Sequence, residues 1–382
     1  MATTLKEWFC LQDGRQNFKP NVRADRELIF CHTEQIEEKA QMSIERSFAT
    51  GEPVKMMIYG NWGVGKTHAV HHICWWLEQN PEYTAETVFV EVGDINKKSR
   101  FDVLIRPFLE EVGINTIVDL VNNYLMSSGG KNIRDGLKAI GIGTEVVEDY
   151  ASFMMTAPGS TPVPATEQAF EHLKGGATKG GSSGKLEQSR DFYDVLASLG
   201  HLFKVVEGKN LILIADEAAR LDEVESDDAT RSHWDAVNRM IFDDSNIYFG
   251  FIYTLGASSE RDIPRVLAHP QTESRIGKRN LIKLENLSEI QTKDFLNNLL
   301  RQFVDLDEVN KLVGAGTIGA EFKAETYPFT EPAYERFVDH WGRDPENAKP
   351  RDICDNLTDA AFIAMKKGKR LIDDATLEAI GM

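Results

Sequence analysis

The sequence predicts an α/β fold in which helices cover both faces of a parallel sheet, followed by a smaller domain made only of helices. Five short segments predict strands because they are apolar almost throughout, which is typical of strands buried on both faces. These segments are residues 54–59, 87–92, 211–215, 247–253 and 281–284. Segments with helical periodicity lie between them, and after residue 288 no further strand is predicted.

The chain before the first strand divides into two parts. Residues 1–31 have a mixed pattern and predict an irregular N-terminal segment. From residue 32 to 49 the pattern predicts a helix, because apolar side chains recur at every fourth position, namely Ile36, Ala40, Ile44 and Phe48. The first strand then begins after Gly51, Glu52 and Pro53 and is followed by Gly60.

The second half of the chain contains an insertion and then the helical domain. Residues 113–190 form the insertion, and residues 156–189 are so rich in Pro, Gly, Ser and Thr that we expect them to be mobile. Helical patterns follow at 288–303, 331–341, 350–367 and 373–381. We therefore predict three parts: the N-terminal segment 1–31, a nucleotide-binding core 32–287 and a helical lid domain 288–382.

Size and composition exclude several classes of protein. A chain of 382 residues has enough residues for a large buried core, so it is not a disulfide-stapled miniprotein. No apolar run approaches the ~20 residues of a membrane span, and the first residues show no signal-peptide pattern. We therefore expect a cytoplasmic protein without membrane contact. The four cysteines have no CxxC spacing, which fits reduced thiols and predicts no zinc site.

Acidic residues dominate the charge. The 60 acidic side chains exceed the 43 basic ones, which leaves a net charge of −17. A surface of this kind repels nucleic acid, so any DNA contact must be local. Two basic clusters could provide it: residues 261–283, and the group Lys366, Lys367, Lys369 and Arg370. Either cluster could instead meet acidic groups at a protein interface, which we favour for residues 261–283.

A glycine-rich motif follows the first predicted strand. It fits the pattern GxxxxGK[ST] and comprises Gly60, Asn61, Trp62, Gly63, Val64, Gly65, Lys66 and Thr67. Glycines let backbone N–H groups converge on a phosphate at the start of the next helix. Lys66 is expected to reach the β- and γ-phosphates of a nucleotide, and the Thr67 hydroxyl to bind Mg²⁺. His68 and His72, on that helix, we interpret as packed side chains and not as metal ligands.

Two carboxylates end the third predicted strand. Asp216 is expected to hold Mg²⁺, and Glu217 to orient or deprotonate the attacking water. A kinase for small molecules must position a hydroxyl group and has less need of the second carboxylate. The pair therefore favours hydrolysis of ATP.

These motifs resemble those of the AAA+ ATPases, in particular the initiator clade of origin-recognition and archaeal replication-initiator proteins, and the transposition-regulator ATPases. Thr254, after the strand at 247–253, matches the sensor 1 position of the family. Ser274 and Arg275 resemble its arginine-finger segment, and Arg351 its sensor 2 arginine. The resemblance covers about residues 20–112 and 191–382. Initiators carry a winged-helix domain after the lid, and we expect none here, because the predicted lid extends to residue 382.

The resemblance implies an oligomer that binds and hydrolyses ATP. Arg351 would act on the γ-phosphate in its own subunit, and Arg275 would complete the site of a neighbouring subunit. A fixed guanidinium stabilises the charge that develops during phosphoryl transfer. The expected function is regulation of a DNA transaction such as transposition, initiation or anti-phage defence, together with a protein effector.

Two other functions remain open. The first is a nucleotide-gated scaffold that binds ATP without hydrolysing it and recruits protein partners. The second is a P-loop kinase for a small molecule, against which Asp216, Glu217 and the helical lid argue. Turnover of ATP separates the scaffold from the hydrolase.

Overall fold

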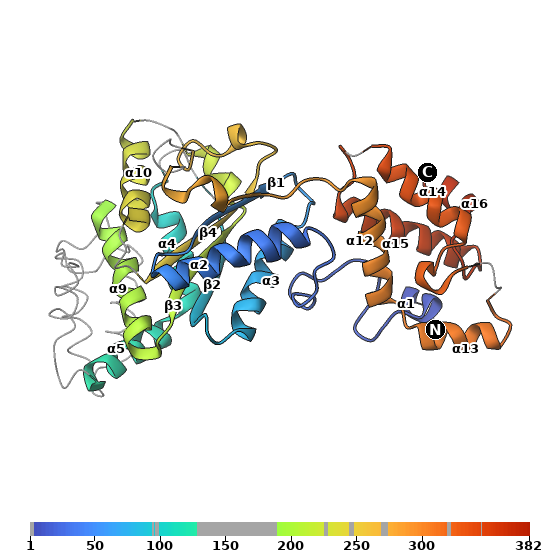
Figure 1. Cartoon of the computed structure of the whole chain (residues 1–382), viewed down its shortest axis with the longest axis horizontal. Helices are drawn as coiled ribbons and strands as arrows, with labels where there is room; N and C mark the ends of the chain where they lie inside the picture. The colour runs from blue at the N-terminus through green and yellow to red at the C-terminus, as the bar shows by residue number, and fades with distance from the viewer. Residues whose placement is uncertain are drawn as a thin grey trace. The chain divides into compact units, whose positions relative to one another are not determined.

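The computed structural model describes two compact units of the chain. The described residues are 4–93, 95, 99–127, 189–224, 228–243, 248–268, 274–318, 322–344 and 346–382. The sheet unit comprises residues 34–60 and 73–283, and the helical unit comprises residues 1–33, 61–72 and 284–382. Figure 1 shows the elements of both units along the chain. Among the described residues, no helix has the length and apolar character needed to cross a bilayer.

The sheet unit contains a parallel sheet of five strands in the order β2-β3-β4-β1-β5, which confirms the predicted fold class. The strands are β1 (Lys55–Gly60), β2 (Ala85–Glu91), β3 (Asn210–Asp216), β4 (Phe249–Gly256) and β5 (Leu281–Lys283). Because all neighbours run in parallel, the carboxyl ends of the strands share one edge of the sheet. The predicted end of the fourth strand, at residue 253, was three residues early: the strand continues through Thr254, whose polar side chain is fully buried.

Helices cover the sheet, and one large apolar core joins them to it. This core holds side chains of α4 (Asp102–Val112), α5 (Ile114–Ser127), α9 (Ser189–Glu207) and α10 (Asp228–Asp243). Figure 1 shows α2 (Met42–Thr50) on the side of the sheet away from α9. The helix predicted at 32–49 is in fact a π-helix, η1 (Glu34–Gln41), followed by α2, and it buries Ile36, Ala40 and Ile44 as its spacing predicts.

The predicted insertion at 113–190 is described only at its two ends. Residues 114–127 form α5, and Ser189 is the first residue of α9. The stretch 156–188, for which we expected mobility, lies outside the described residues. The prediction therefore stays a prediction for that stretch.

A buried histidine links α10 to α9 and to the start of α4. His233 is 8% exposed, and its Nε2 accepts a hydrogen bond from the Phe101 N–H at 3.4 Å. Its Nδ1 therefore carries the proton of the neutral ring and donates to the Ser189 hydroxyl at 3.1 Å. Burial, aided by the charge of Arg100, lowers the pKa of His233 to about 4. The fold thus accepts only the neutral imidazole.

This histidine should make the sheet unit less stable in acid. In the unfolded chain His233 binds a proton near pH 6.5, whereas in the folded chain it does so near pH 4. The contribution of His233 to the free energy of unfolding is complete above pH 6.5. As the pH falls toward 4, up to about 3 kcal/mol of this contribution is lost. We expect His233→Asn to flatten the pH dependence of the unfolding free energy over this range, measured by urea denaturation. The exposed His340, changed to Asn, is the matched control, and equal slopes for wild type and His233→Asn would contradict the assignment.

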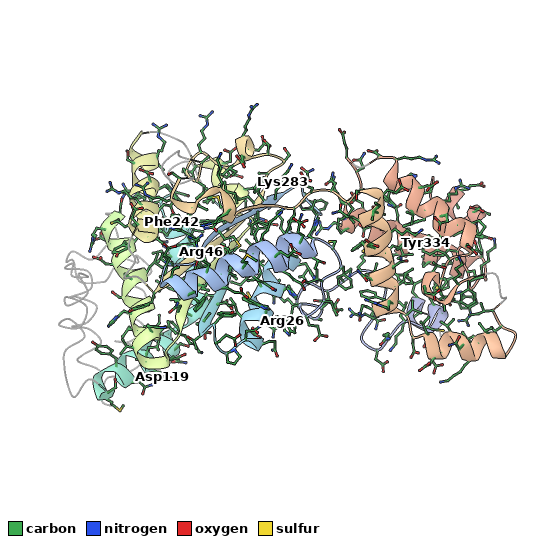
Figure 2. The ribbon with its side chains drawn as sticks, in the orientation of Figure 1. Arg26, Arg46, Asp119, Phe242, Lys283 and Tyr334 are labelled. Atoms are coloured by element: carbon green, nitrogen blue, oxygen red, sulfur yellow. The ribbon has the colours of Figure 1, made fainter. Side chains whose placement is uncertain are left out.

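The helical unit surrounds a second apolar core. Its helices are α1 (Leu5–Phe9), α12 (Glu289–Phe303), α13 (Leu306–Gly314), α14 (Glu331–Gly342), α15 (Pro350–Lys366) and α16 (Asp374–Glu378). Ser288 caps α12 with Gln291 in a capping box, and Pro350 opens α15, where the absent N–H is harmless. Tyr334 of α14, labelled in Figure 2, is buried and donates a hydrogen bond to Asn297 of α12 at 2.6 Å.

Residues 10–31 of the N-terminal segment are irregular, as the sequence predicted, but the segment contains a short helix and is part of this core. Residues 5–9 form α1, which a capping box of Thr4 and Glu7 begins. Phe9 and Phe18 are fully buried, and the indole of Trp8 donates to the Lys369 carbonyl at 2.8 Å. A helix of five residues is too short to show a period, which is why the pattern concealed it.

Candidate functional site

The glycine-rich motif forms a loop between β1 and α3 (Lys66–Gln79). Gly60 is the last residue of β1, and Lys66 is the first of α3. Gly63 and Gly65 have φ angles of 89° and 103°, a conformation that glycine adopts without strain. The Lys66 ammonium donates to the Asn61 carbonyl at 2.9 Å across the loop. The structure therefore builds the strand, glycine loop and helix that a phosphate-binding motif requires.

The start of α15 contacts this loop within the helical unit. The Arg351 N–H donates to the Gly63 carbonyl at 3.3 Å, and the guanidinium of Arg351 lies 3.8 Å from the centre of the Trp62 ring. A Cβ atom on Gly63 would lie 3.3 Å from the Cβ of Arg351. The structure thus brings Arg351, the predicted sensor 2 residue, to the glycine-rich loop.

Three histidines join residues 26–32 to the loop and to α3. His32 Nε2 lies 3.0 Å from the Val64 carbonyl, so it carries a proton and donates there. His68 and His72 bond in the same way to the carbonyls of Leu28 and Arg26, at 2.7 and 2.9 Å. Burial lowers the pKa of each of the three rings. These bonds explain the spacing of His68 and His72, and the role of His32 was not predicted.

The acidic pair lies at the carboxyl end of β3 in the sheet unit. Asp216 is the last residue of β3 and is 5% exposed. Glu217 follows in the left-handed conformation, with φ 56°, which ends the strand. The Thr254 hydroxyl of β4 donates to Asp216 Oδ1 and accepts the Glu217 N–H at 3.2 Å. The predicted sensor 1 residue and both acidic residues are therefore adjacent.

Arg220 is a site residue that sequence reasoning missed. Its guanidinium lies 2.6 Å from the Glu217 carboxylate and donates to the Val92 carbonyl at 2.9 Å. It also lies 3.5 Å from Glu91. The sequence places Arg220 three residues after Glu217, and this spacing of opposite charges could have indicated their ion pair. The contacts of Arg220 with Val92 and Glu91 could not be predicted, because they depend on how β2 and β3 pair in the sheet. Arg220 thus restrains the side chain of Glu217.

Arg275 lies elsewhere in the sheet unit. Its guanidinium Nε forms an ion pair with Asp243 Oδ1, at the end of α10, over 2.7 Å. The Arg275 side chain is 20% exposed and that of Asp243 is 50% exposed. That Arg275 completes the site of a neighbouring subunit stays a prediction.

The basic cluster at the end of α15 makes contacts within the helical unit. The Arg370 guanidinium covers the Trp8 ring at 4.3 Å, and Lys369 forms an ion pair with Asp373. Lys367 donates to the Ala375 carbonyl at 3.2 Å. These contacts give the cluster a structural role, and a role in binding DNA stays a prediction.

Replacing Thr254 by Val should destabilise the sheet unit. Valine has a similar shape, but it leaves the Asp216 carboxylate and the Glu217 N–H without their hydroxyl partner. The buried position makes this loss cost about 1–3 kcal/mol in unfolding free energy, measured by urea denaturation. Thr254→Ser, which keeps the hydroxyl, is the control. Equal stability of Thr254→Val and wild type would show that the two bonds do not hold the acidic pair.

A parallel sheet with a glycine loop after β1 and an acidic pair after β3 forms a P-loop fold, and this fold is similar to that of archaeal initiator AAA+ proteins. Among solved structures, the ORC2 protein of Aeropyrum pernix in ADPNP–ADP complexes is similar, with a TM-score of 0.51 and 16% identity over 97% of this chain and 71% of that one. Cdc6p from Pyrobaculum aerophilum gives a TM-score of 0.48 and 14% identity, over 93% and 67%. The sequence matches no protein-family model and no curated protein.

Proposed function

We propose that the chain binds ATP together with Mg²⁺ and hydrolyses ATP to ADP and phosphate. The observation that carries this proposal is the loop from Gly60 to Thr67, folded with Gly63 and Gly65 at positive φ directly before α3. Backbone N–H groups and the positive end of a helix dipole at such a place favour phosphate. In this proposal Lys66 binds the β- and γ-phosphates.

The acidic pair supports hydrolysis as the reaction. The P-loop continues directly from the carboxyl end of β1, and Asp216 lies at the carboxyl end of β3 in the same parallel sheet. The Thr67 hydroxyl and the Asp216 carboxylate are hard oxygen ligands, which suit Mg²⁺. The metal ion supplies charge neutralisation at the phosphates. Glu217, restrained by Arg220, orients the attacking water and accepts its proton.

We extend this proposal to an oligomer that regulates a DNA transaction, such as transposition, initiation or anti-phage defence, through a protein effector. In it Arg275 completes the site of a neighbouring subunit, which makes hydrolysis depend on assembly. In the sequence, Arg275 lies among the other basic residues of 261–283. These residues can bind either acidic groups of a neighbouring subunit or the phosphates of DNA. The similar ORC2 protein was solved with the nucleotides ADPNP and ADP, which agrees with a nucleotide-binding role.

The proposed activity is tested by nucleotide binding and phosphate release, each with and without duplex DNA. We expect wild type to do both and Lys66→Ala to lose about 10- to 100-fold in ATP affinity, since it loses a charge-assisted bond to phosphate. Lys311→Ala, which changes an exposed lysine of the helical unit, is the control. Binding without release would favour the nucleotide-gated scaffold, and absence of both would overturn the proposal.

A further inference from the structure

The phosphate-binding loop carries a large aromatic side chain that the proposed reaction does not use. Trp62 lies in the middle of the loop and is 65% exposed, although exposure of an indole is unfavourable in water. Its ring is covered on one face by the guanidinium of Arg351, at 3.8 Å from the ring centre. This stacked pair joins the loop to the first turn of α15.

A backbone bond fixes the position of this pair. The first N–H groups of a helix have no partner within it, and the Arg351 N–H donates to the Gly63 carbonyl instead. Position 63 favours glycine, because its φ is 89° and because a Cβ there would lie 3.3 Å from the Arg351 Cβ, which is a tight contact. The main chain of Arg351 is therefore held beside the residue that follows Trp62, and the stack then determines where its side chain points.

We propose that Trp62 is a positioning residue for Arg351, and that it holds the guanidinium where it can bind the γ-phosphate of ATP. This inference rests on the proposed binding of ATP. A guanidinium that lies over an aromatic ring keeps the N–H groups at its edge, in the plane of the guanidinium, available to bond phosphate oxygens. The stack removes rotamer freedom that Arg351 would otherwise lose when it binds phosphate. Trp62 therefore increases the affinity for ATP and leaves the affinity for ADP unchanged.

The stack itself is tested without nucleotide. Incorporation of 5-fluorotryptophan labels all six tryptophans, and the resonance that disappears in Trp62→Phe belongs to Trp62. We expect Arg351→Ala to shift this ¹⁹F resonance and to leave the other five in place. An unchanged Trp62 resonance would overturn the proposal, whether or not the chain binds ATP.

The effect on binding is tested with the β,γ-imido analogue of ATP and with ADP, both with Mg²⁺, by titration calorimetry. An exposed cation–π pair corresponds to about a two- to fivefold change in an equilibrium constant. We expect Trp62→Leu to weaken the ATP analogue by that factor and to leave ADP unchanged, with Trp62→Phe in between. In the Arg351→Ala background, Trp62→Leu should have no further effect.

The matched control lies on the same helix. Phe362 is exposed and lies under the Lys366 ammonium at 5.3 Å, so Phe362→Leu removes a similar pair near the other end of α15. It should leave both affinities unchanged. Equal losses for ADP and the ATP analogue, or the same loss without Arg351, would overturn the positioning role while ATP binding stands. A wild-type chain that binds neither nucleotide would overturn the proposed function and, with it, the role in binding.

Discussion

Glu217→Gln is expected to lower the rate of ATP hydrolysis by about 10²- to 10⁴-fold, the usual contribution of a general base. Glutamine has nearly the same shape but cannot accept a proton from water. Affinity for ATP should persist, because the loop from Gly60 to Thr67 is unchanged. Steady-state phosphate release gives the rate, and equilibrium titration gives the affinity.

Two controls separate this chemical role from a structural one. Arg220→Gln removes the ion pair with Glu217 but keeps the carboxylate, so it should retain far more activity than Glu217→Gln. Glu223→Gln changes an exposed acidic residue at the end of η2 (Ala218–Glu223) and should behave as wild type. If Glu217→Gln kept more than a tenth of the wild-type rate, Glu217 would not be the base.

Arg275→Ala is expected to lower the hydrolysis rate by about 10³- to 10⁵-fold, as removal of an arginine finger does. If the finger acts on a neighbouring subunit, mixing this variant with Glu217→Gln restores activity. An intact Glu217 then meets an intact Arg275 at roughly a quarter of the interfaces of a random equal mixture in a head-to-tail assembly. The measurement is phosphate release against mixing ratio.

The ion pair with Asp243 supplies the competing explanation for Arg275. If Arg275 acts only by holding α10, Asp243→Asn should reproduce the loss, and mixing should restore nothing. Arg279→Ala changes an exposed arginine of the same segment and controls for the loss of positive charge. Absence of recovery in the mixture would rule out the shared site.

The sheet was predictable because its strands carry their own signal. Apolar runs bounded by glycine or polar residues located all five strands. The predicted bounds lie within two residues of the observed ones except at the end of β4, where the buried Thr254 interrupts an apolar run without ending the strand. The helical unit was predicted less completely. The short α1 and α13 were missed, although Asp305 caps α13 by accepting bonds from the N–H groups of Asp307 and Glu308.

The candidate site was also predicted only in part. Its motif residues are adjacent in the chain, so residue types and spacing alone located the glycine loop and the acidic pair. Its restraining contacts join residues that are distant in sequence, such as Thr254 with Asp216 and Trp62 with Arg351. No periodicity encodes such pairs.

The sequence by itself determined the α/β class, the glycine-rich loop between β1 and α3 and the position of the acidic pair Asp216 and Glu217. Each is specified by consecutive residues whose backbone preferences and chemistry act locally. Only the tertiary structure decided that Thr254 bonds both acidic residues, that Arg220 restrains Glu217 and that Arg351 stacks on Trp62. These contacts depend on how strands pair and helices pack, which sets the reach of each side chain over a few ångströms.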